Sequence, residues 1–176
     1  FEGTTCYPMI QRDVMIKQLP ILKKKYIRAH DYAASSIEDI FTTTQLKSAL
    51  VLSCDMLETG WWENEKGHFK FHALPIQAQV SLVNSILVYD FDLDGIQDIF
   101  VAGNKYNMEV ETGRLDAGTG AYFKGEKGTT FRWINNLETG IWANKDVRDA
   151  SLLVGPENHL SIIISNNNDY IQVYRK

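Results

Sequence analysis

Four aspartates crowd into nine residues near the middle of the chain. They stand at positions 1, 3, 5 and 9 of the loop Asp90–Asp98, and a glycine stands at position 6. Carboxylates this close together repel one another, so the loop is poorly stable unless a cation neutralises them. Hard oxygen ligands suit calcium, which binds about six to eight of them. Gly95 allows the sharp turn that brings the later ligands back to the ion. The loop therefore predicts a calcium site.

An EF-hand loop begins with the same spacing of aspartates, but the residues that flank the present loop distinguish it from an EF-hand. An EF-hand needs a bidentate glutamate at position 12 and a helix on each side. Position 12 here is Val101, and the short apolar runs Ile86–Val88 and Ile99–Val101 predict a strand–loop–strand unit. We expect Asp98 to supply the closing carboxylate. The other expected ligands are the side chains of Asp90, Asp92 and Asp94 and the backbone carbonyl of Ile96. The alternative is a solvated acidic turn that binds no ion.

The bulk composition is that of an ordinary globular chain. Its 176 residues are 44% hydrophobic and 23% charged, which suffices for one domain or a little more. The net charge of −4 gives no general attraction to nucleic acid or to an anionic membrane. No run of 18 apolar residues exists, so no transmembrane segment is expected. The chain begins at Phe1 in the middle of a pattern, which predicts a processed product or a piece of a longer protein.

The two cysteines, Cys6 and Cys54, are 48 residues apart and do not form a disulfide framework. The sequence leaves their pairing open and favours two buried free thiols over a disulfide. Because no cluster of histidines and cysteines accompanies them, zinc is not expected.

Residues 1–47 have the apolar spacing of helices. The pattern predicts a helix from Met9 to Tyr26 that Pro20 interrupts, and a second helix over Asp31–Phe41 with Asp31 as its N-cap. A third, short helix is expected to start after Thr43 or Thr44 and to end at Ala49. The basic run at residues 23–25 is interpreted as the solvated end of a helix, with a basic binding patch as the alternative.

From residue 50 onward the pattern predicts strands. Leu50–Ser53 is expected to form a buried strand, and hairpins are expected to turn at Glu65–Gly67 and Glu126–Gly128. Further strands are expected at Ser85–Tyr89, Ile99–Ala102, Ala150–Val154, Leu160–Ile164 and Tyr170–Tyr174. The polar, glycine-rich residues 104–120 predict a long loop, a favourable place for contact with a partner.

The two hairpins repeat in register, 61 residues apart from Gly67 to Gly128. Before each hairpin comes an apolar strand that ends in small or amide residues. After a loop, this apolar strand leads to an aromatic strand. A unit of about 60 residues that holds several short strands and recurs indicates propeller blades. An ordinary β-sandwich would not repeat its hairpins in this way.

These features resemble a known family. Asp90–Asp98, with Ile99–Asn104 after it, resembles the calcium-loop blade of FG-GAP/VCBS-repeat proteins, and the same loop type occurs in integrin α-subunit propellers. Trp61–Phe71 resembles the blade hairpin of that family. Arg12–Phe41 resembles a helical insertion of large extracytoplasmic VCBS-repeat proteins from Bacteroidetes-type bacteria. The resemblance covers nearly all of the chain.

The resemblance implies a mostly-β fold of propeller blades, part of a larger propeller, with an N-terminal α-helical insertion. The implied organisation is a helical insertion within a blade at residues 1–47, the remainder of that blade at 48–79, a calcium-loop blade at 80–136 and C-terminal blade strands at 137–176. It also implies a secreted protein or an outer-membrane lipoprotein. Calcium is abundant outside cells, where a site with a Kd of about 10⁻⁴–10⁻³ M stays filled.

Three functions are open at this point. The first is a calcium-stabilised platform, without catalysis, that binds a protein or glycan at the bacterial surface and packs against the rest of its propeller. The second is a polysaccharide lyase or hydrolase, which needs paired carboxylates or a His/Tyr base at the central channel. Asp146, Asp149 and Glu109 are available, but their spacing indicates no pair. The third is a calcium-dependent adhesion module. We favour the first.

The tryptophans bear on the glycan question, because indole rings can stack on sugars. Neighbours in a strand face opposite sides, so we expect at least half of the tryptophans in the core rather than at a ligand. They are Trp61, Trp62, Trp133 and Trp142.

Overall fold

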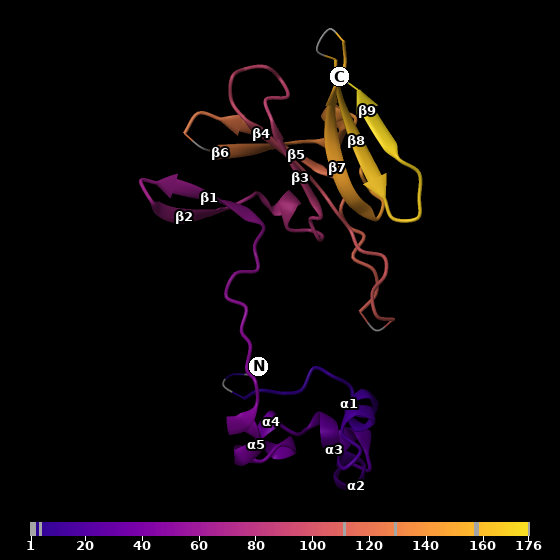
Figure 1. Cartoon of the computed structure of the whole chain (residues 1–176). Helices are drawn as coiled ribbons and strands as arrows, with labels where there is room; N and C mark the ends of the chain where they lie inside the picture. The colour runs from indigo at the N-terminus through magenta and orange to yellow at the C-terminus, as the bar shows by residue number, and fades with distance from the viewer. Residues whose placement is uncertain (1–2, 4, 111, 129, 157–158, 176) are drawn as a thin grey trace. The chain divides into compact units, whose positions relative to one another are not determined.

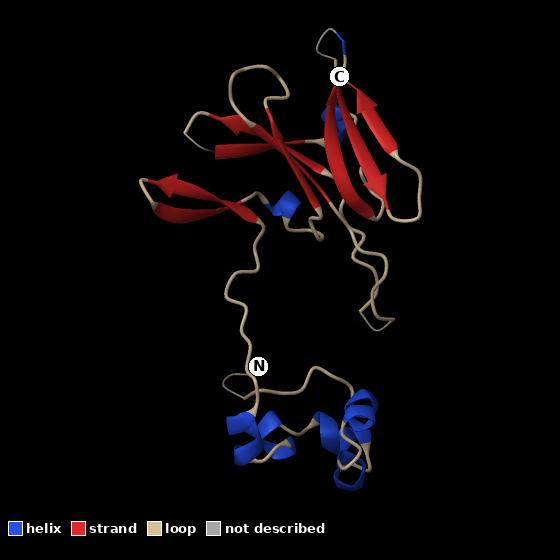
Figure 2. Ribbon diagram, in the orientation of Figure 1, coloured by secondary structure: helices blue, strands red, loops and turns tan. Residues whose placement is uncertain are grey.

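The computed structural model describes all residues except 1–2, 4, 111, 129, 157–158 and 176. The ends of the expected pattern, Phe1 and Lys176, therefore lie outside the described residues. The chain forms two compact units, Phe1–Asp55 and Met56–Lys176. We call them the helical unit and the β unit (Figures 1 and 2). In the part of the chain that the structure describes, no helix is long and apolar enough to cross a membrane.

The helical unit is built from short helices around a small core. Leu22, Tyr26, Tyr32 and Ile40 are buried, and the rings of Tyr26 and Tyr32 meet edge to face with centroids 5.5 Å apart. The expected interruption at Pro20 is confirmed, because it falls between the first two helices. The helices are α1 Arg12–Gln18, α2 Leu22–Lys25, α3 Ala29–Ala33, α4 Ile37–Ile40 and α5 Thr43–Ser48.

The single helix expected over Asp31–Phe41 is wrong, because the chain stops and restarts at Ser36. The Ser36 hydroxyl accepts a hydrogen bond from the backbone N–H of Asp39 at 3.2 Å, and the Ser36 N–H donates to the Asp39 carboxylate at 2.9 Å. This capping box begins α4. Asp31 lies inside α3 rather than at its cap. Likewise Thr42 caps α5, so that helix begins one residue before the earliest expected start.

The capping box predicts an acid-sensitive α4. Hydrogen bonds from the backbone N–H and then the hydroxyl of Ser36 hold the pKa of Asp39 below its ordinary value of 3.8. A lowered pKa stabilises the folded state above the ordinary pKa, and that contribution is lost as pH falls through the lowered pKa. In the full-length protein, the NMR Cα shifts of α4 should report this acid transition. Asp39→Asn should remove the transition, whereas Glu38→Gln, a neighbouring exposed carboxylate, should leave it unchanged.

The structure agrees with the interpretation of the basic run at residues 23–25 and disagrees with the strand expected at Leu50–Ser53. Residues 23–25 form the exposed last turn of α2, as the interpretation of a solvated helix end requires. The buried strand expected at Leu50–Ser53 is wrong: Leu50, Val51 and Leu52 are 85%, 81% and 82% exposed. A strand needs a hydrogen-bonding neighbour, and no described strand pairs with this run. Cys54 is exposed rather than buried.

The β unit is built from antiparallel sheets, so the chain is mostly β. Among its described residues the strand orders are β1-β2, β3-β4-β5-β6 and β7-β8-β9. A 3₁₀ helix, η1 Ile76–Ala78, follows the first sheet, and α6 Asn136–Thr139 follows the second. The strands are β1 Gly60–Glu65, β2 His68–Ala73, β3 Ser85–Tyr89, β4 Asp98–Ala102, β5 Ala121–Glu126, β6 Thr130–Ile134, β7 Val147–Val154, β8 Leu160–Asn166 and β9 Gln172–Arg175.

Both expected hairpins are present. In the first, Glu65 pairs with His68, and Lys66 and Gly67 both have positive φ, of 55° and 95°. Two left-handed residues form the two-residue turn that suits the twist of a hairpin. In the second, β5 pairs with β6, and residue 129 of its turn lies outside the described residues. The later strands match the expected ones, except that β7 begins three residues earlier and β9 two residues later.

The sheet β3–β6 is covered on both faces. One face packs on β7–β9 through a core that includes Phe100, Val147 and Ile164, and the other holds a core that includes Phe123, Trp61 and Trp133. Successive residues of a strand point to opposite faces. As a result, all five residues of β4 are buried. The loop that precedes β4 is therefore anchored to the centre of the β unit.

The tryptophans divide as expected. Trp61 and Trp133 pack against the core, whereas Trp62 and Trp142 are 52% and 44% exposed. Half of them thus contribute to the core.

Candidate metal centre

The acidic loop joins β3 to β4 and bends through two left-handed residues. Gly95 has a φ of 88° and Leu93 a φ of 62°. Glycine adopts this conformation readily, as expected for the sharp turn, whereas a bulky residue such as Leu93 is strained there. Leu93 is also 77% exposed, so core packing does not account for the strain. The loop thus makes its sharp turn between Asp92 and Asp98.

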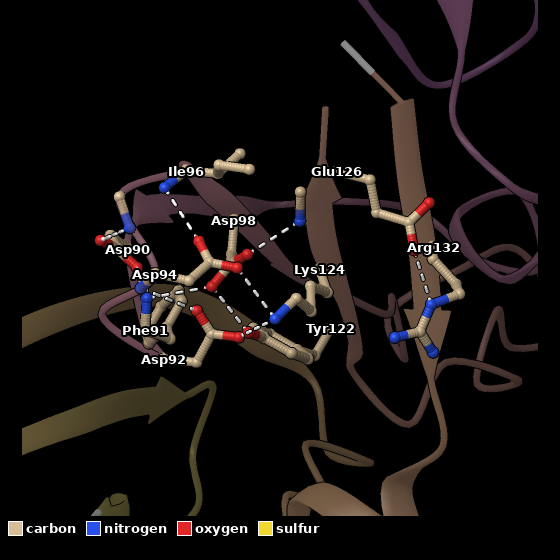
Figure 3. A network of polar contacts seen from close by, with 12 residues as sticks. Asp90, Phe91, Asp92, Asp94, Ile96, Asp98, Tyr122, Lys124, Glu126 and Arg132 are labelled. Carbon is tan, nitrogen blue, oxygen red and sulfur yellow. Dashed lines mark hydrogen bonds and ion pairs between the residues drawn. The ribbon is translucent and has the colours of Figure 1, made fainter. Parts of the chain in front are cut away.

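Backbone N–H groups of the loop hold these carboxylates in place (Figure 3). Asp90 accepts hydrogen bonds from the N–H groups of Asp94 at 3.1 Å and Gly95 at 2.8 Å. Asp94 accepts one from the N–H of Ile96 at 2.9 Å. The loop therefore orients two of its carboxylates through its own backbone.

Asp98 is fully buried and ties the loop to β5. Its Oδ2 accepts hydrogen bonds from the Phe91 N–H at 3.0 Å and the Tyr122 hydroxyl at 2.7 Å. Its Oδ1 accepts one from the Gly125 N–H at 2.8 Å. Burial, and then the bond to Asp98, raise the pKa of Tyr122, so its hydroxyl stays protonated as the donor.

Gly125 is required for this close approach. A Cβ on Gly125 would lie 2.2 Å from the carbonyl oxygen of Gln97, closer than atoms can pack. The glycine therefore allows β5 to lie against the loop and its N–H to reach Asp98.

Asp90, Asp92 and Asp98 could hold a metal ion. Each offers a carboxylate oxygen, and these oxygens lie within 4.8 Å of one another. Three of the four expected side-chain ligands are thus brought together. Asp94 lies outside this group. The expected ligation by the Ile96 carbonyl stays a prediction.

Lys124 of β5 neutralises part of the loop and accounts for the position of Asp94. Its ammonium pairs with the carboxylates of Asp92 and Asp94, the latter at 2.9 Å (Figure 3). Hydrogen bonds to Asp92 and then Asp94 raise the pKa of Lys124. Lys124, followed by the Ile96 N–H, holds the pKa of Asp94 below its ordinary value. A protein cation therefore lies against two of the expected ligands.

The sequence analysis missed both Lys124 and Tyr122. The two residues alternate with Phe123 in an expected strand, which indicates that they share a face. Their meeting with the loop depends on β5 pairing with β4, a contact between residues 20 to 24 positions apart.

The carboxylates considered for catalysis lie elsewhere. Asp146 is buried and accepts hydrogen bonds from Arg148 and Asn167, both at 3.1 Å. Asp149, in β7, accepts one from the Ser85 hydroxyl at 3.2 Å. Glu109 belongs to the long loop of residues 104–120. Asp146 and Asp149 thus serve as hydrogen-bond acceptors within the β unit.

Comparison of the chain with protein-family models, with curated proteins and with solved structures found no match. The resemblance to FG-GAP/VCBS-repeat proteins therefore stays a prediction, and the site's own geometry carries the functional argument.

Proposed function

We propose that this chain is a calcium-stabilised, extracytoplasmic β-propeller module that serves as a platform for a protein or glycan at the bacterial cell surface. The observation that carries the proposal is that carboxylate oxygens of Asp90, Asp92 and Asp98 converge in the loop that precedes the buried strand β4. The calcium would have a structural role, because it would relieve the repulsion between carboxylates that belong to the fold.

The donor set favours calcium over other cations. The converging atoms are all carboxylate oxygens, which suit hard cations, whereas zinc sites usually include cysteine or histidine. Magnesium prefers compact octahedral sites that keep several waters, whereas calcium accepts a looser set of protein oxygens. Lys124 already pairs with Asp92 and Asp94, so calcium would have to compete with a protein cation at this place.

The packing of the sheets supports the propeller. The first strands of two successive sheets, β3 and β7, lie side by side, and the Ala150 N–H donates to the Ser85 hydroxyl at 2.8 Å. The Asn84 amide donates to the Val147 carbonyl at 2.7 Å at the same junction. In a propeller, the first strands of neighbouring blades lie side by side near the central axis, and the later strands of each blade follow outward.

The proposal is tested by thermal unfolding with EDTA and with about 5 mM calcium. For a Kd of about 10⁻⁴–10⁻³ M, calcium should stabilise the wild type by about 1–2 kcal/mol and raise its Tm by several degrees. Asp90→Asn/Asp92→Asn should abolish the rise, because it removes the charge of two converging ligands. Asp116→Asn, an exposed aspartate of the long loop, is the matched control and should keep it.

Magnesium at the same concentration provides the comparison for selectivity. An equal response to both ions would contradict a calcium-selective site. No response of the wild type to calcium would leave the loop as an acidic turn neutralised by Lys124.

A further inference from the structure

A cleft lies directly beside the acidic loop, between β5 and β6 of one sheet and β8 and β9 of the next. Its volume is about 480 Å³, within the range of roughly 300–1,000 Å³ that is typical of small-molecule sites. The walls include Tyr122 and Lys124 from β5 and Tyr174 from β9. Glu138 and Arg175 also line the cleft, so its charged side chains, with Lys124 and Asp92, are two of each sign. Asp92 of the loop also lines it, so the cleft and the candidate metal centre share Asp92, Tyr122 and Lys124.

The two tyrosines line the cleft, and their hydroxyls are engaged by other parts of the chain. The Tyr122 hydroxyl is committed to Asp98 at 2.7 Å, and the Tyr174 hydroxyl donates to the Trp142 carbonyl at 2.7 Å. Both rings are therefore fixed in orientation. Fixed aromatic rings in a half-open cleft suit a ligand that has flat apolar faces, such as a sugar ring.

Lys124 gives the cleft a charge that depends on the loop. Its ammonium is now engaged by Asp92 and Asp94. When a divalent cation neutralises these carboxylates, Lys124 loses its attraction to the loop and is repelled by the ion. Lys124 also lines the cleft, so its ammonium can turn toward a ligand there. The cleft thus gains a cation when the loop gains one.

We propose that this cleft binds a short acidic oligosaccharide, with sugar rings against Tyr122 and Tyr174 and a sugar carboxylate paired with Lys124, and that calcium in the loop strengthens this binding. The inference rests on the proposed calcium site and names the ligand class of the platform. Because linkage is reciprocal, the saccharide strengthens calcium binding by the same factor.

The test is isothermal titration of the full-length protein with a galacturonate trisaccharide and with neutral galactotriose, in EDTA and in calcium. In calcium, we expect the acidic trisaccharide to bind at least about fivefold more tightly than in EDTA. It should also bind more tightly than galactotriose. Asp90→Asn/Asp92→Asn in calcium controls for calcium that the sugar binds in solution, and should show no gain over EDTA.

Lys124→Gln and Arg132→Gln form a matched pair of variants. Arg132 lies opposite Lys124 on β6, on the same sheet face, but pairs with Glu126 at 2.8 Å. Lys124→Gln should lose the calcium-dependent gain in affinity for the acidic sugar, because Arg175, the other cation of the cleft, forms no ion pair with the loop among the described residues. It should also bind calcium severalfold more tightly, since a competing charge is gone. Arg132→Gln should change neither property. Circular dichroism in calcium verifies that both variants are folded.

The outcomes separate this inference from the calcium site. A calcium-dependent Tm without saccharide binding, or equal binding of both trisaccharides, overturns the saccharide site and leaves the calcium site intact. Equal binding of the acidic sugar in EDTA and calcium overturns the coupling. A Tm that does not respond to calcium overturns the metal site and the coupling together.

Discussion

Replacing Asp98 by alanine is expected to destabilise the β unit by about 3 kcal/mol or more, with or without calcium. The substitution leaves three buried donors without their acceptor: the N–H groups of Phe91 and Gly125 and the Tyr122 hydroxyl. Hydrogen bonds to a charged group are among the strongest, and a buried donor that loses its partner keeps its full desolvation cost. Urea unfolding in EDTA and in calcium measures the loss.

Asp92→Ala separates ligation from folding. Asp92 pairs with Lys124 at a site where its side chain is 30% exposed, and such ion pairs contribute at most about 1 kcal/mol. In EDTA this variant should unfold close to the wild type, yet it should lose most of the calcium response. If Asp98→Ala in EDTA also unfolds like the wild type, the hydrogen bonds of Asp98 do not stabilise the fold and its carboxylate acts only in ligation.

Asp98 is both a candidate metal ligand and a hydrogen-bond acceptor for β5, and the spacing of the aspartates predicted only the first role. The positions of the four aspartates and Gly95 indicated a cation loop between strands, because the turn and the convergence of three carboxylates are local properties. The same spacing gave no sign that Asp98 also holds β5, since that contact joins segments 27 residues apart. Lys124 and Tyr122 were missed for the same reason.

The two hairpins were predictable and the exposed run at residues 50–53 was not. A hairpin is specified by its own turn, as at Lys66 and Gly67, where two left-handed residues join alternating strands. An apolar run such as Leu50–Ser53 has strand propensity, but only a neighbouring strand makes it a strand. In the helical unit the reverse error arose, because the Ser36 capping box overrode an apolar spacing that suited one long helix.

Replacing Asn104 is expected to have a second large effect, far from the metal centre. Asn104 is fully buried, and all of its side-chain hydrogen-bonding groups are engaged. Its Nδ2 donates to the carbonyls of Gly118 at 2.9 Å and Lys145 at 3.0 Å. Its Oδ1 accepts from the Ser81 hydroxyl at 2.7 Å and the Gly118 N–H at 3.0 Å. One amide thus closes the base of the long loop and joins it to the segment before β7.

We expect Asn104→Ala to cost about 3 kcal/mol or more and to make the loop at residues 105–117 susceptible to limited proteolysis. Asn104→Asp should be at least as damaging, although it has the same shape, because it sets a carboxylate oxygen against two carbonyls and buries a charge. Asn107→Ala, in the exposed part of the same loop, should change the free energy of unfolding by less than about 0.5 kcal/mol. An Asn104→Asp variant as stable as the wild type would show that the donors of this amide are dispensable. The loop would then be held by the acceptor of this amide alone, and the hydrogen bonds of Asn84 and Ser85 would still join the sheets β3–β6 and β7–β9.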